Sequence, residues 1–386
     1  MNADFLLQEQ HVLLRDSVRR FCANVVSPRA KDIDQSGEFP KDIYQAAAEL
    51  GLFGLMIPAD EGSGGDTLMQ GLVQEELAKS SATVANIQAA AHEVALTLHE
   101  HASASLRGKY LSDVIAGRKI PAFALTEPSA GSDASSIKTK AVKKNDCYVI
   151  NGQKQFVTFG SVADFVVVLA VTDQTKSKRN ISAILVEVNT PGVQVAKQEN
   201  LVGVRGTATA AIGFENCEVP TSNLLGEEGS GLHLGLSQID KGRISTAAMA
   251  VGISQAALNA ALAYARERVQ FGERIFNFQA VQFKLAEMAM RVDAARLLYV
   301  NAAMLRDRGD RSARISSEAK LFASQTAAWV TDEAVQIFGG YGYVKDNPIE
   351  RFWRDAKITQ IYEGTSNIQH LIIARELDKE SQGHGI

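Results

Sequence analysis

The sequence predicts an α+β protein in which a helical domain, a β domain and a second helical domain follow one another along the chain. Three observations predict this order. Helical periodicity with many alanines fills residues 1–120, and short β-branched or aromatic runs fill residues 121–233. Long Ala-rich stretches with few helix breakers then fill residues 234–386. These three ranges are the predicted N-terminal α-helical domain, middle β domain and C-terminal helical bundle.

The elements can be predicted in order from the same patterns. In the first domain, apolar residues at helical spacing start near Leu6, a turn covers residues 57–65, and helices run from Leu68 to about Gly117. The strands predicted in the second domain cover residues 149–150, 156–158, 165–171, 181–188, 193–195 and 210–214. The long helices predicted in the third domain cover residues 244–268, 281–306 and 312–338.

Turn signals such as Asn151-Gly152 and Pro191-Gly192 separate the predicted strands. No helix-length pattern lies between these strands. We therefore expect an antiparallel barrel or sandwich in the middle domain rather than a βαβ sheet.

Composition excludes several classes of function. The chain has 386 residues and a net charge of −4, which argues against nucleic acid as the main ligand. Its longest apolar stretch, residues 165–171, is about a third of the ~20 residues that a membrane helix needs. The three cysteines lie far apart, so they predict neither a disulfide framework nor a metal site. The first 20 residues contain several charged side chains, so they do not have the apolar segment of a signal peptide. We expect a cytoplasmic protein with no membrane span, no nucleic-acid partner and no metal site.

Two short segments have the composition of a binding site. Residues 125–133 form a loop rich in hydroxyls and small side chains, which on its own is more typical of an ordinary capped turn than of a binding loop. In residues 361–369, Ser366 and Gln369 predict a capping box, with a helix starting just after Ser366. Glu363 then lies on a tight turn beside Tyr362. Exclusion of water there would raise the pKa of its carboxyl, as a general base requires, whereas a solvated Glu is the ordinary alternative.

Taken together, these segments resemble the acyl-CoA dehydrogenase family, and the resemblance runs from the first helix to Leu377. Its motifs, in the order and spacing of the family, are residues 125–133, 154–160, 203–209, 268–272, 278–279, 336–342 and 362–366. The resemblance implies an FAD-dependent enzyme that converts an acyl-CoA thioester to the trans-2-enoyl-CoA and passes electrons to an electron-transferring flavoprotein. It also implies a homotetramer built as a dimer of dimers.

The resemblance also assigns site residues. Glu363 matches the catalytic base, which removes the α proton while the β hydrogen leaves as hydride to FAD. The residues that match FAD contacts are Phe123, Leu125, Thr126, Gly131, Ser132, Phe156, Thr158, Arg268, Phe271, Gln279, Gln336, Gly340, Thr365 and Asn367. The residues that match substrate contacts are Ser132, Asp240, Arg243, Tyr362 and Gly364.

Within the FAD set, the resemblance gives the ADP part to Arg268, Phe271 and Gln279. It has Gln336 and Gly340 reach the same ADP part from a neighbouring subunit.

Residues that depart from the family pattern bear on the substrate. Some members carry the base at the position of Gly242, which here has no side chain, so Glu363 is the candidate base. Phe159 stands where the family usually has Asn, and we expect a local packing change, with an altered acceptor or substrate as the alternative. On the helix that lines the acyl pocket, His92 and Glu93 are polar where members often have small or apolar groups. We therefore expect a short to medium or branched acyl group.

Three alternatives remain open at this stage. The acyl group could be tethered to a carrier protein in a biosynthetic pathway. The chain could be a catalytically idle FAD-fold subunit that serves in binding or assembly, although Glu363, Thr126, Thr158 and Arg268 argue against this. A flavin monooxygenase is the least favoured, because such relatives typically lack the base.

Overall fold

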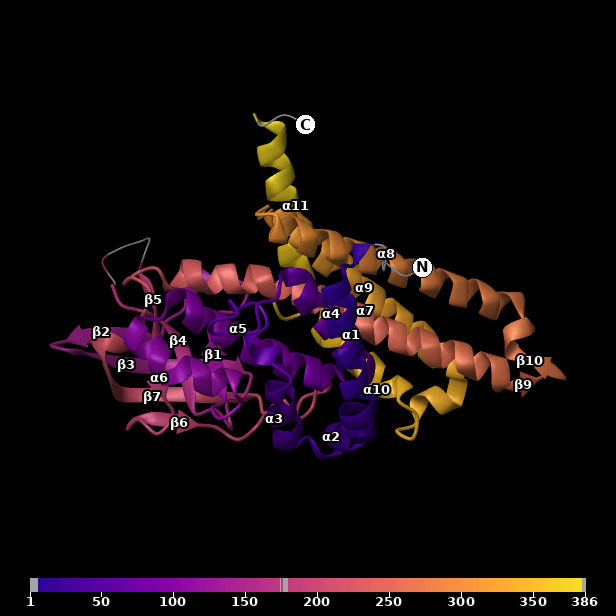
Figure 1. Cartoon of the computed structure of the whole chain (residues 1–386), viewed down its shortest axis with the longest axis horizontal. Coiled ribbons are helices and arrows are strands. Elements are labelled where there is room, and N and C mark those ends of the chain that lie inside the picture. The colour runs from indigo at the N-terminus through magenta and orange to yellow at the C-terminus, as the bar shows by residue number, and fades with distance from the viewer. Residues whose placement is uncertain (1–5, 174, 176–179, 311, 384–386) are drawn as a thin grey trace.

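The structure is a computed structural model that describes residues 6–173, 175, 180–310 and 312–383. It confirms the predicted order of a helical, a β and a second helical region (Figure 1). The first region contains α1 (Glu9–Phe21), α2 (Ala30–Ser36), α3 (Lys41–Glu49), α4 (Thr67–Ser80), α5 (Ala82–His101) and α6 (Ala104–Ile115). Side-chain caps define two of the helix starts, because Asp66 accepts from the backbone N–H of Met69 and Ser81 from that of Val84.

The β region forms one mixed sheet. Its strands are β1 (Pro121–Ala124), β2 (Lys140–Lys144), β3 (Cys147–Val157), β4 (Phe165–Val171), β5 (Ile181–Glu187), β6 (Val193–Val195), β7 (Ala210–Pro220) and β8 (Leu224–Leu225). The order across the sheet is β6-β7-β3-β2-β4-β5-β8, with β1 paired to β4. Most pairs are antiparallel, as predicted, but β1 is parallel to β4, and β2 also meets β4 in parallel at Lys140 and Val171. The loop after β1 and the β2–β3 hairpin provide the long connection that parallel pairing needs.

The turn predicted at Asn151-Gly152 is wrong, because both residues lie inside β3. The register between β3 and β7 shifts between Ile150 and Gly152, so the pair marks an irregularity in a continuous strand. Gly152 has a φ of 151°, and a Cβ there would stand 2.7 Å from the Cα of Thr139. A glycine is needed at this point because the neighbouring backbone approaches closely, not because the chain reverses.

The C-terminal region is a helical bundle. Its elements are α7 (Gly231–Glu267), the hairpin of β9 (Val269–Gln270) and β10 (Glu273–Arg274), α8 (Gln279–Asp307), α9 (Ala313–Phe338), α10 (Ile349–Ile358) and α11 (Ser366–Ser381). The predicted start of the first of these helices near Ile244 is wrong. The glycines in its first turns weaken the local helical signal, but Gly231 lets the helix approach the sheet: a Cβ there would stand 2.4 Å from the carbonyl carbon of Ser182.

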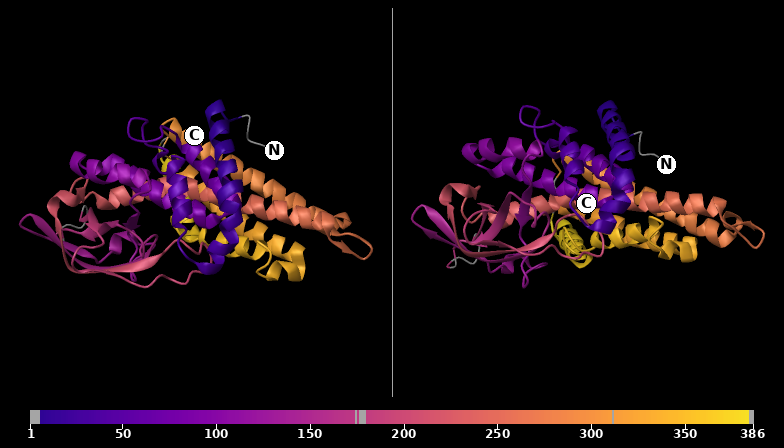
Figure 2. Two further views of the ribbon diagram at one scale, coloured as in Figure 1. Left: turned by 60° about the horizontal axis from the view of Figure 1, so that its bottom comes forward. Right: turned by 90° about the horizontal axis from the view of Figure 1, so that it is seen from below.

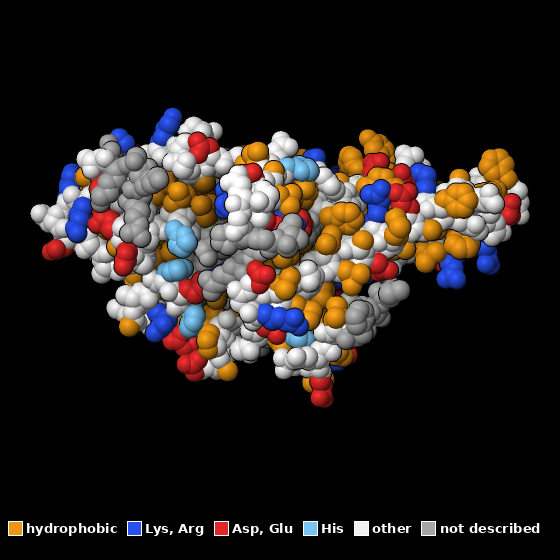
Figure 3. Space-filling model, turned by 90° about the horizontal axis from the view of Figure 1, so that it is seen from above, with side chains coloured by type: hydrophobic (Ala, Val, Ile, Leu, Met, Phe, Trp, Pro, Cys, Tyr) orange, Lys and Arg blue, Asp and Glu red, His pale blue; other side chains and the backbone are white. Residues whose placement is uncertain are grey.

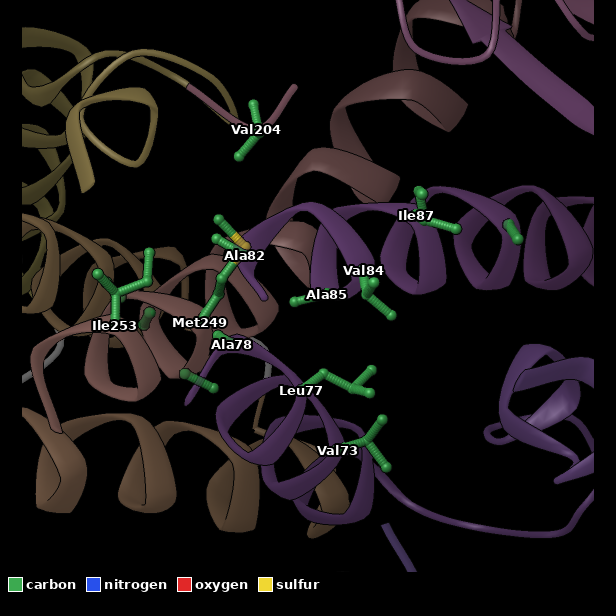
Figure 4. Close-up of a cluster of buried hydrophobic side chains, with 14 of the residues drawn as sticks. Val73, Leu77, Ala78, Ala82, Val84, Ala85, Ile87, Val204, Met249 and Ile253 are labelled. Carbon is green, nitrogen blue, oxygen red and sulfur yellow. The ribbon is translucent and has the colours of Figure 1, made fainter. Parts of the chain in front are cut away.

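Small residues let α4, α5 and α7 pack closely in the main core. Leu77, Ala85 and Met249 meet there, with Ile253 from the next turn of α7 (Figure 4). A Cβ at Gly252 would stand 2.4 Å from the carbonyl oxygen of Glu75 on α4. One described helix, α7, is long and apolar enough to cross a membrane, but 67% of its most apolar window is buried. Its apolar side chains are thus accounted for by packing in this core.

The length of α7 sets the shape of the molecule. Its 37 residues correspond to about 55 Å. It starts beside the sheet and ends at the β9–β10 hairpin, at the opposite tip of the molecule (Figure 1). Two further views show the same separation (Figure 2). Residues at the two ends of α7 therefore cannot contact one small ligand within a single chain.

Candidate active site

Glu363 lies on a strained turn between α10 and α11. Its φ is 53°, a left-handed value that is uncommon for a residue other than glycine, and Gly364 follows with a φ of 85°. Two buried side chains hold this turn. The amide of Gln369 donates to the carbonyls of Glu363 and Gly364 at 3.0 and 2.9 Å, and Lys320 Nζ donates to the Gly364 carbonyl at 2.7 Å. The backbone strain is thus maintained by three hydrogen bonds.

The predicted capping box at Ser366 and Gln369 is wrong in its details. The structure places the N-cap of α11 at Thr365, whose hydroxyl accepts from the backbone N–H of Ile368. Gln369 is fully buried and holds the Glu363 turn instead of capping the helix. A Gln three residues after a Ser fits a capping box, and the same Gln can instead hold the turn before the helix. The sequence does not distinguish these two roles.

The Glu363 carboxylate stands directly over Gly242 on α7. A Cβ at residue 242 would lie 2.6 Å from Glu363 Oε2, closer than any real Cβ contact. Loss of water raises the pKa of Glu363 to about 7, and the nearby charges of Lys320 and Arg243 limit the rise. A carboxyl with such a pKa is partly ionised near neutral pH and can accept a proton there.

Replacing Lys320 with Met should shift the pH dependence of the reaction upwards. Lys320 is completely buried, and its charge favours the ionised form of Glu363. Without this charge the pKa of Glu363 rises further, so the base form is populated only at higher pH. We expect the midpoint of the rising limb of kcat/KM to move up by about one pH unit. The matched control is Lys357→Met on α10, whose lysine is exposed; equal midpoints in both variants would contradict the assignment.

Tyr362 and Glu363 face side chains from both helical regions. The Tyr362 hydroxyl lies 3.3 Å from the sulfur of Met249 and forms hydrogen bonds with Asn86 and Thr246. Burial raises the pKa of Tyr362 far above its ordinary value, so this hydroxyl stays neutral. The tyrosine therefore joins α5 and α7 next to the carboxylate.

Asp240 and Arg243 lie one turn apart on α7, and their side chains contact each other. Arg243 donates to Asp240 Oδ1 at 3.0 Å, and Asp240 also accepts from Ser316 and Arg306 at 2.7 Å each. The Arg243 side chain is buried, and its Nε has no partner among the described residues. Asp240 is thus fully engaged by the protein, whereas Arg243 acts on Glu363 through its charge.

Thr126, Phe156 and Thr158 form a second surface, here called the β3 wall. Phe156 lies where the register between β3 and β7 shifts, with a φ of 55° and 62% of its area exposed. The backbone N–H of Gln155 donates to the Thr126 carbonyl at 2.8 Å, which ties the 125–133 loop to the end of β3. Segments that carry an exposed aromatic ring and two hydroxyls suit the binding of a flat polar ring system.

A buried ion pair fixes the β3 wall from behind. Lys154 Nζ donates to Glu127 Oε1 at 2.8 Å, and both side chains are almost completely buried. The same carboxylate accepts from the backbone N–H groups of Lys138 and Thr139. Removal of one partner from such a buried pair strongly destabilises a protein. The pair therefore fixes the loop relative to the strand.

The remaining residues near the wall are placed as follows. Phe159 is fully buried and packs edge-on against Phe39 and Tyr44, which agrees with the expected local packing change. Gly131 and Ser132 are exposed at the rim of the loop. The half-buried residues of this region are Phe123, Leu125, Thr126 and Thr158.

The residues assigned to the ADP part lie at the opposite tip of the molecule. Arg268 and Gly340 line one open pocket of about 930 Å³, and the Arg268 guanidinium lies 5.5 Å from the centre of the Tyr341 ring. Phe271, 96% exposed, projects from the adjoining hairpin. Gln279 starts α8 and Gln336 belongs to the last turn of α9; both are exposed. One chain thus contributes both Arg268 and Gly340 to one pocket, where the resemblance had divided them between subunits.

These two surfaces fit the two parts of FAD. The β3 wall offers an aromatic face and hydroxyls for a flavin, and the pocket at Arg268 offers a guanidinium and an open backbone for phosphates. A Cβ at Gly340 or Gly131 would meet no protein atom within 4 Å, so both glycines border free space. Among the described residues there is no group of His, Cys, Asp and Glu suited to a metal ion.

Sequence reasoning missed Lys320 and gave Gln369 the role of a helix cap, so it identified neither of them as holding the turn of the candidate base. Lys320 is distant from Glu363 in the sequence, and Gln369 lies within an ordinary helical pattern. A signal for Lys320 existed, because at helical spacing it shares a face of α9 with the small residues Ser317, Ala323 and Ser324. A charged residue on such a face of a buried helix needs a partner, which could have been sought at the Glu363 turn.

Comparison with known proteins covers all three regions. Models for the N-terminal, middle and C-terminal domains of acyl-CoA dehydrogenase match residues 8–118, 122–217 and 229–377. The probable acyl-CoA dehydrogenase YngJ of Bacillus subtilis is 44% identical over 379 residues, which cover 97% of this chain and 100% of the relative.

Two solved structures are similar over almost the whole chain. Butyryl-CoA dehydrogenase from Megasphaera elsdenii has a TM-score of 0.93 and 39% identity, covering 96% of this chain and 98% of the other. A chain from a structure of the electron transferring flavoprotein of Acidaminococcus fermentans has a TM-score of 0.94 and 40% identity, covering 98% and 99%.

Proposed function

Because the chain belongs to the acyl-CoA dehydrogenase family of FAD-dependent oxidoreductases, we propose that Glu363 is its catalytic base. The reaction is the α,β-dehydrogenation of an acyl-CoA thioester to the trans-2-enoyl-CoA. The observation that carries this proposal is the carboxylate itself: it stands over Gly242, in a strained turn, with a pKa of about 7. FAD, when bound, accepts the β hydrogen as hydride.

The residues around Glu363 favour removal of the α proton. Among the described residues, no protein group accepts a hydrogen bond from the backbone N–H of Glu363. This N–H is therefore available to the thioester carbonyl, where it would stabilise the negative charge that develops as the α proton leaves. The proton moves to the Glu363 carboxylate, whose position is maintained by Lys320 and Gln369.

The separation of the two FAD surfaces supports a shared binding site. The β3 wall belongs to the sheet, beside which α7 starts, whereas Arg268 directly follows the far end of this helix of about 55 Å, so a dinucleotide is too short to reach both within one chain. We assign the flavin part to Thr126, Phe156 and Thr158 of one protomer. The ADP part is bound by Arg268, Phe271, Gln279, Gln336 and Gly340 of another, and Thr365 and Asn367 contact FAD beside the base.

An exposed apolar stripe supports association of the chains. Phe283, Met290 and Leu297 on α8 are spaced seven residues apart and are 67%, 63% and 45% exposed. In the space-filling view, apolar side chains gather at the end of the molecule that the C-terminal helices form (Figure 3). A heptad-spaced stripe on a long helix suits helix packing against a second copy, in accord with a homotetramer made of two dimers.

Replacing Arg268 with Glu should release FAD while leaving the β3 wall intact. The substitution puts a negative charge where the pyrophosphate would bind, so we expect FAD affinity to fall by at least about 100-fold. The measurement is the ratio of bound flavin to protein after gel filtration. Arg308→Glu, which changes an exposed arginine at the end of α8, is the control and should retain FAD. An R268E protein that keeps its flavin would contradict the assignment.

The electron acceptor and the acyl carrier complete the proposal. Electrons pass from the reduced protein to an electron-transferring flavoprotein, which the likeness to the Acidaminococcus chain supports. The substrate is an acyl-CoA of short to medium length or with a branch, in a cytoplasmic enzyme. Thioesters on a carrier protein are the alternative substrate, and a comparison of turnover on the two carriers distinguishes them.

The spectrum of the purified protein tests the function directly. We expect a yellow protein with bound FAD, whose flavin absorbance is bleached anaerobically by one member of an acyl-CoA panel. That member also identifies the chain length. A colourless protein that cannot be reconstituted with FAD would refute the proposal, and efficient bleaching by carrier-bound acyl groups alone would favour the alternative substrate.

A further inference from the structure

A second carboxyl, that of Glu93 on α5, faces the same point as the candidate base. A Cβ at Gly242 would stand 2.6 Å from Glu363 Oε2 and 3.1 Å from Glu93 Oε1. The two oxygens are therefore no farther apart than these two distances combined. Glu93 is half-buried and belongs to the helix that also supplies Asn86 to Tyr362. Two carboxyl groups from different domains thus converge where the acyl group would react.

The surroundings of the two carboxyls differ. Glu363 is compensated by the buried cations Lys320 and Arg243. Among the described residues, no side chain forms a hydrogen bond or an ion pair with the Glu93 carboxyl. The cation whose charge acts on it is Lys241, and the Lys241 ammonium contacts both oxygens of Glu100.

These surroundings determine which carboxyl carries a proton. Burial and the neighbouring Glu363 charge raise the pKa of Glu93 well above its ordinary value, and the Lys241 charge offsets this only in part. Two carboxyls this close do not both ionise readily. The better compensated one, Glu363, is then the anion, and Glu93 keeps its proton. A protonated carboxyl is a hydrogen-bond donor, and this one has no acceptor within the described protein.

We propose that Glu93 is a specificity-determining residue whose carboxyl donates a hydrogen bond to an oxygen of the acyl group beyond its β-carbon. This inference rests on the proposed function, because it places the acyl chain between Glu363 and Glu93. An unsubstituted chain would leave the donor buried against methylene groups, which costs binding free energy. The preferred acyl thioester therefore carries a hydroxyl or carbonyl oxygen on its third or a later chain carbon after the thioester carbonyl.

The test compares matched ligands and four variants. The ligands are butyryl-CoA and 4-hydroxybutyryl-CoA for flavin reduction, and their 2-enoyl products for equilibrium binding by calorimetry. The products bind without reacting, so their affinity is independent of turnover. Glu93→Gln keeps a donor but cannot be an anion, Glu93→Leu removes the donor, and Glu100→Gln removes a carboxyl two turns along the same helix. FAD content and the thermal midpoint confirm that each variant is folded, and Glu93→Ala is a second donor-free variant.

We expect the native protein to favour the hydroxylated ligand by at least about tenfold in both kcat/KM and affinity. Glu93→Gln and Glu100→Gln should retain this preference, and Glu93→Leu and Glu93→Ala should abolish it. A preference that survives in both donor-free variants would overturn the inference. So would a native preference for 4-aminobutyryl-CoA that Glu93→Gln removes, because that result identifies an anionic Glu93 that binds a cation.

Failure of the proposed function has a different signature. If no acyl-CoA reduces the flavin and the products do not bind, the reaction itself has been assigned wrongly. If butyryl-CoA bleaches the flavin efficiently and the hydroxyl group gives no advantage, the dehydrogenase assignment stands and only the role of Glu93 is refuted.

Discussion

Glu363→Gln should retain FAD and acyl-CoA binding but reduce the rate of flavin reduction by about 10⁴-fold. Gln has nearly the same shape as Glu, and the backbone hydrogen bonds from Gln369 and Lys320 do not involve the changed atoms. The turn should therefore keep its conformation. An amide does not accept the α proton at neutral pH, so the loss is confined to the chemical step. The measurement is single-turnover reduction of the flavin under anaerobic conditions.

The comparison with Glu93 makes this experiment specific. Glu93→Gln removes an equivalent carboxyl that faces the same point over Gly242. It should leave reduction by an unsubstituted acyl-CoA within about tenfold of the native rate, because the amide only replaces one donor by another. Fast reduction in the Glu363 variant together with slow reduction in the Glu93 variant would assign the base to α5.

Gly242→Ala should slow flavin reduction by about 100-fold without unfolding the protein. The added methyl group would stand 2.6 Å from Glu363 Oε2, so the carboxylate has to move away from its position over α7. A displacement of about 1 Å of a catalytic group can cost a factor of this size. Because the obstructed group is the end of a flexible side chain, the backbone can remain in place and the cost in stability should be small.

A second glycine on the same helix serves as the control. At Gly252 a Cβ would stand 2.4 Å from a backbone carbonyl of α4, which cannot rotate away. Gly252→Ala should therefore lower the thermal midpoint, whereas Gly242→Ala should lower kcat at a nearly unchanged midpoint. Native reduction rates in Gly242→Ala would show that the position of the carboxylate over α7 is not required.

Patterns that depend on neighbouring residues could be predicted from the sequence, and patterns that depend on packing could not. The long helices follow from their alanines and apolar periodicity. The start of α7 was missed because Gly231 has a low helix propensity, which the close approach to Ser182 outweighs. Asn151-Gly152 has the composition of a hairpin turn, yet the glycine serves a close contact with Thr139 inside a strand.

The candidate site shows the same division. The family motifs identified Glu363 and its turn, because these residues are adjacent in the sequence. Lys320, which stabilises both the turn and the ionised carboxylate, comes from another helix and carries no motif of its own. The position of Arg268 far from the β3 wall likewise depends on the length of α7, which the predicted helix start had underestimated.

The span of α7 has a consequence for cells that contain two alleles of this protein. On the proposed arrangement, the start of α7 completes the chemistry of its own protomer, whereas its end completes the FAD site of a neighbour. A defective Arg268 would therefore inactivate the flavin on the partner and not its own, and a defective Glu363 only its own. Mixed assemblies of the two mutants should regain activity at one of two sites, so the alleles would complement each other, while each would be inactive alone.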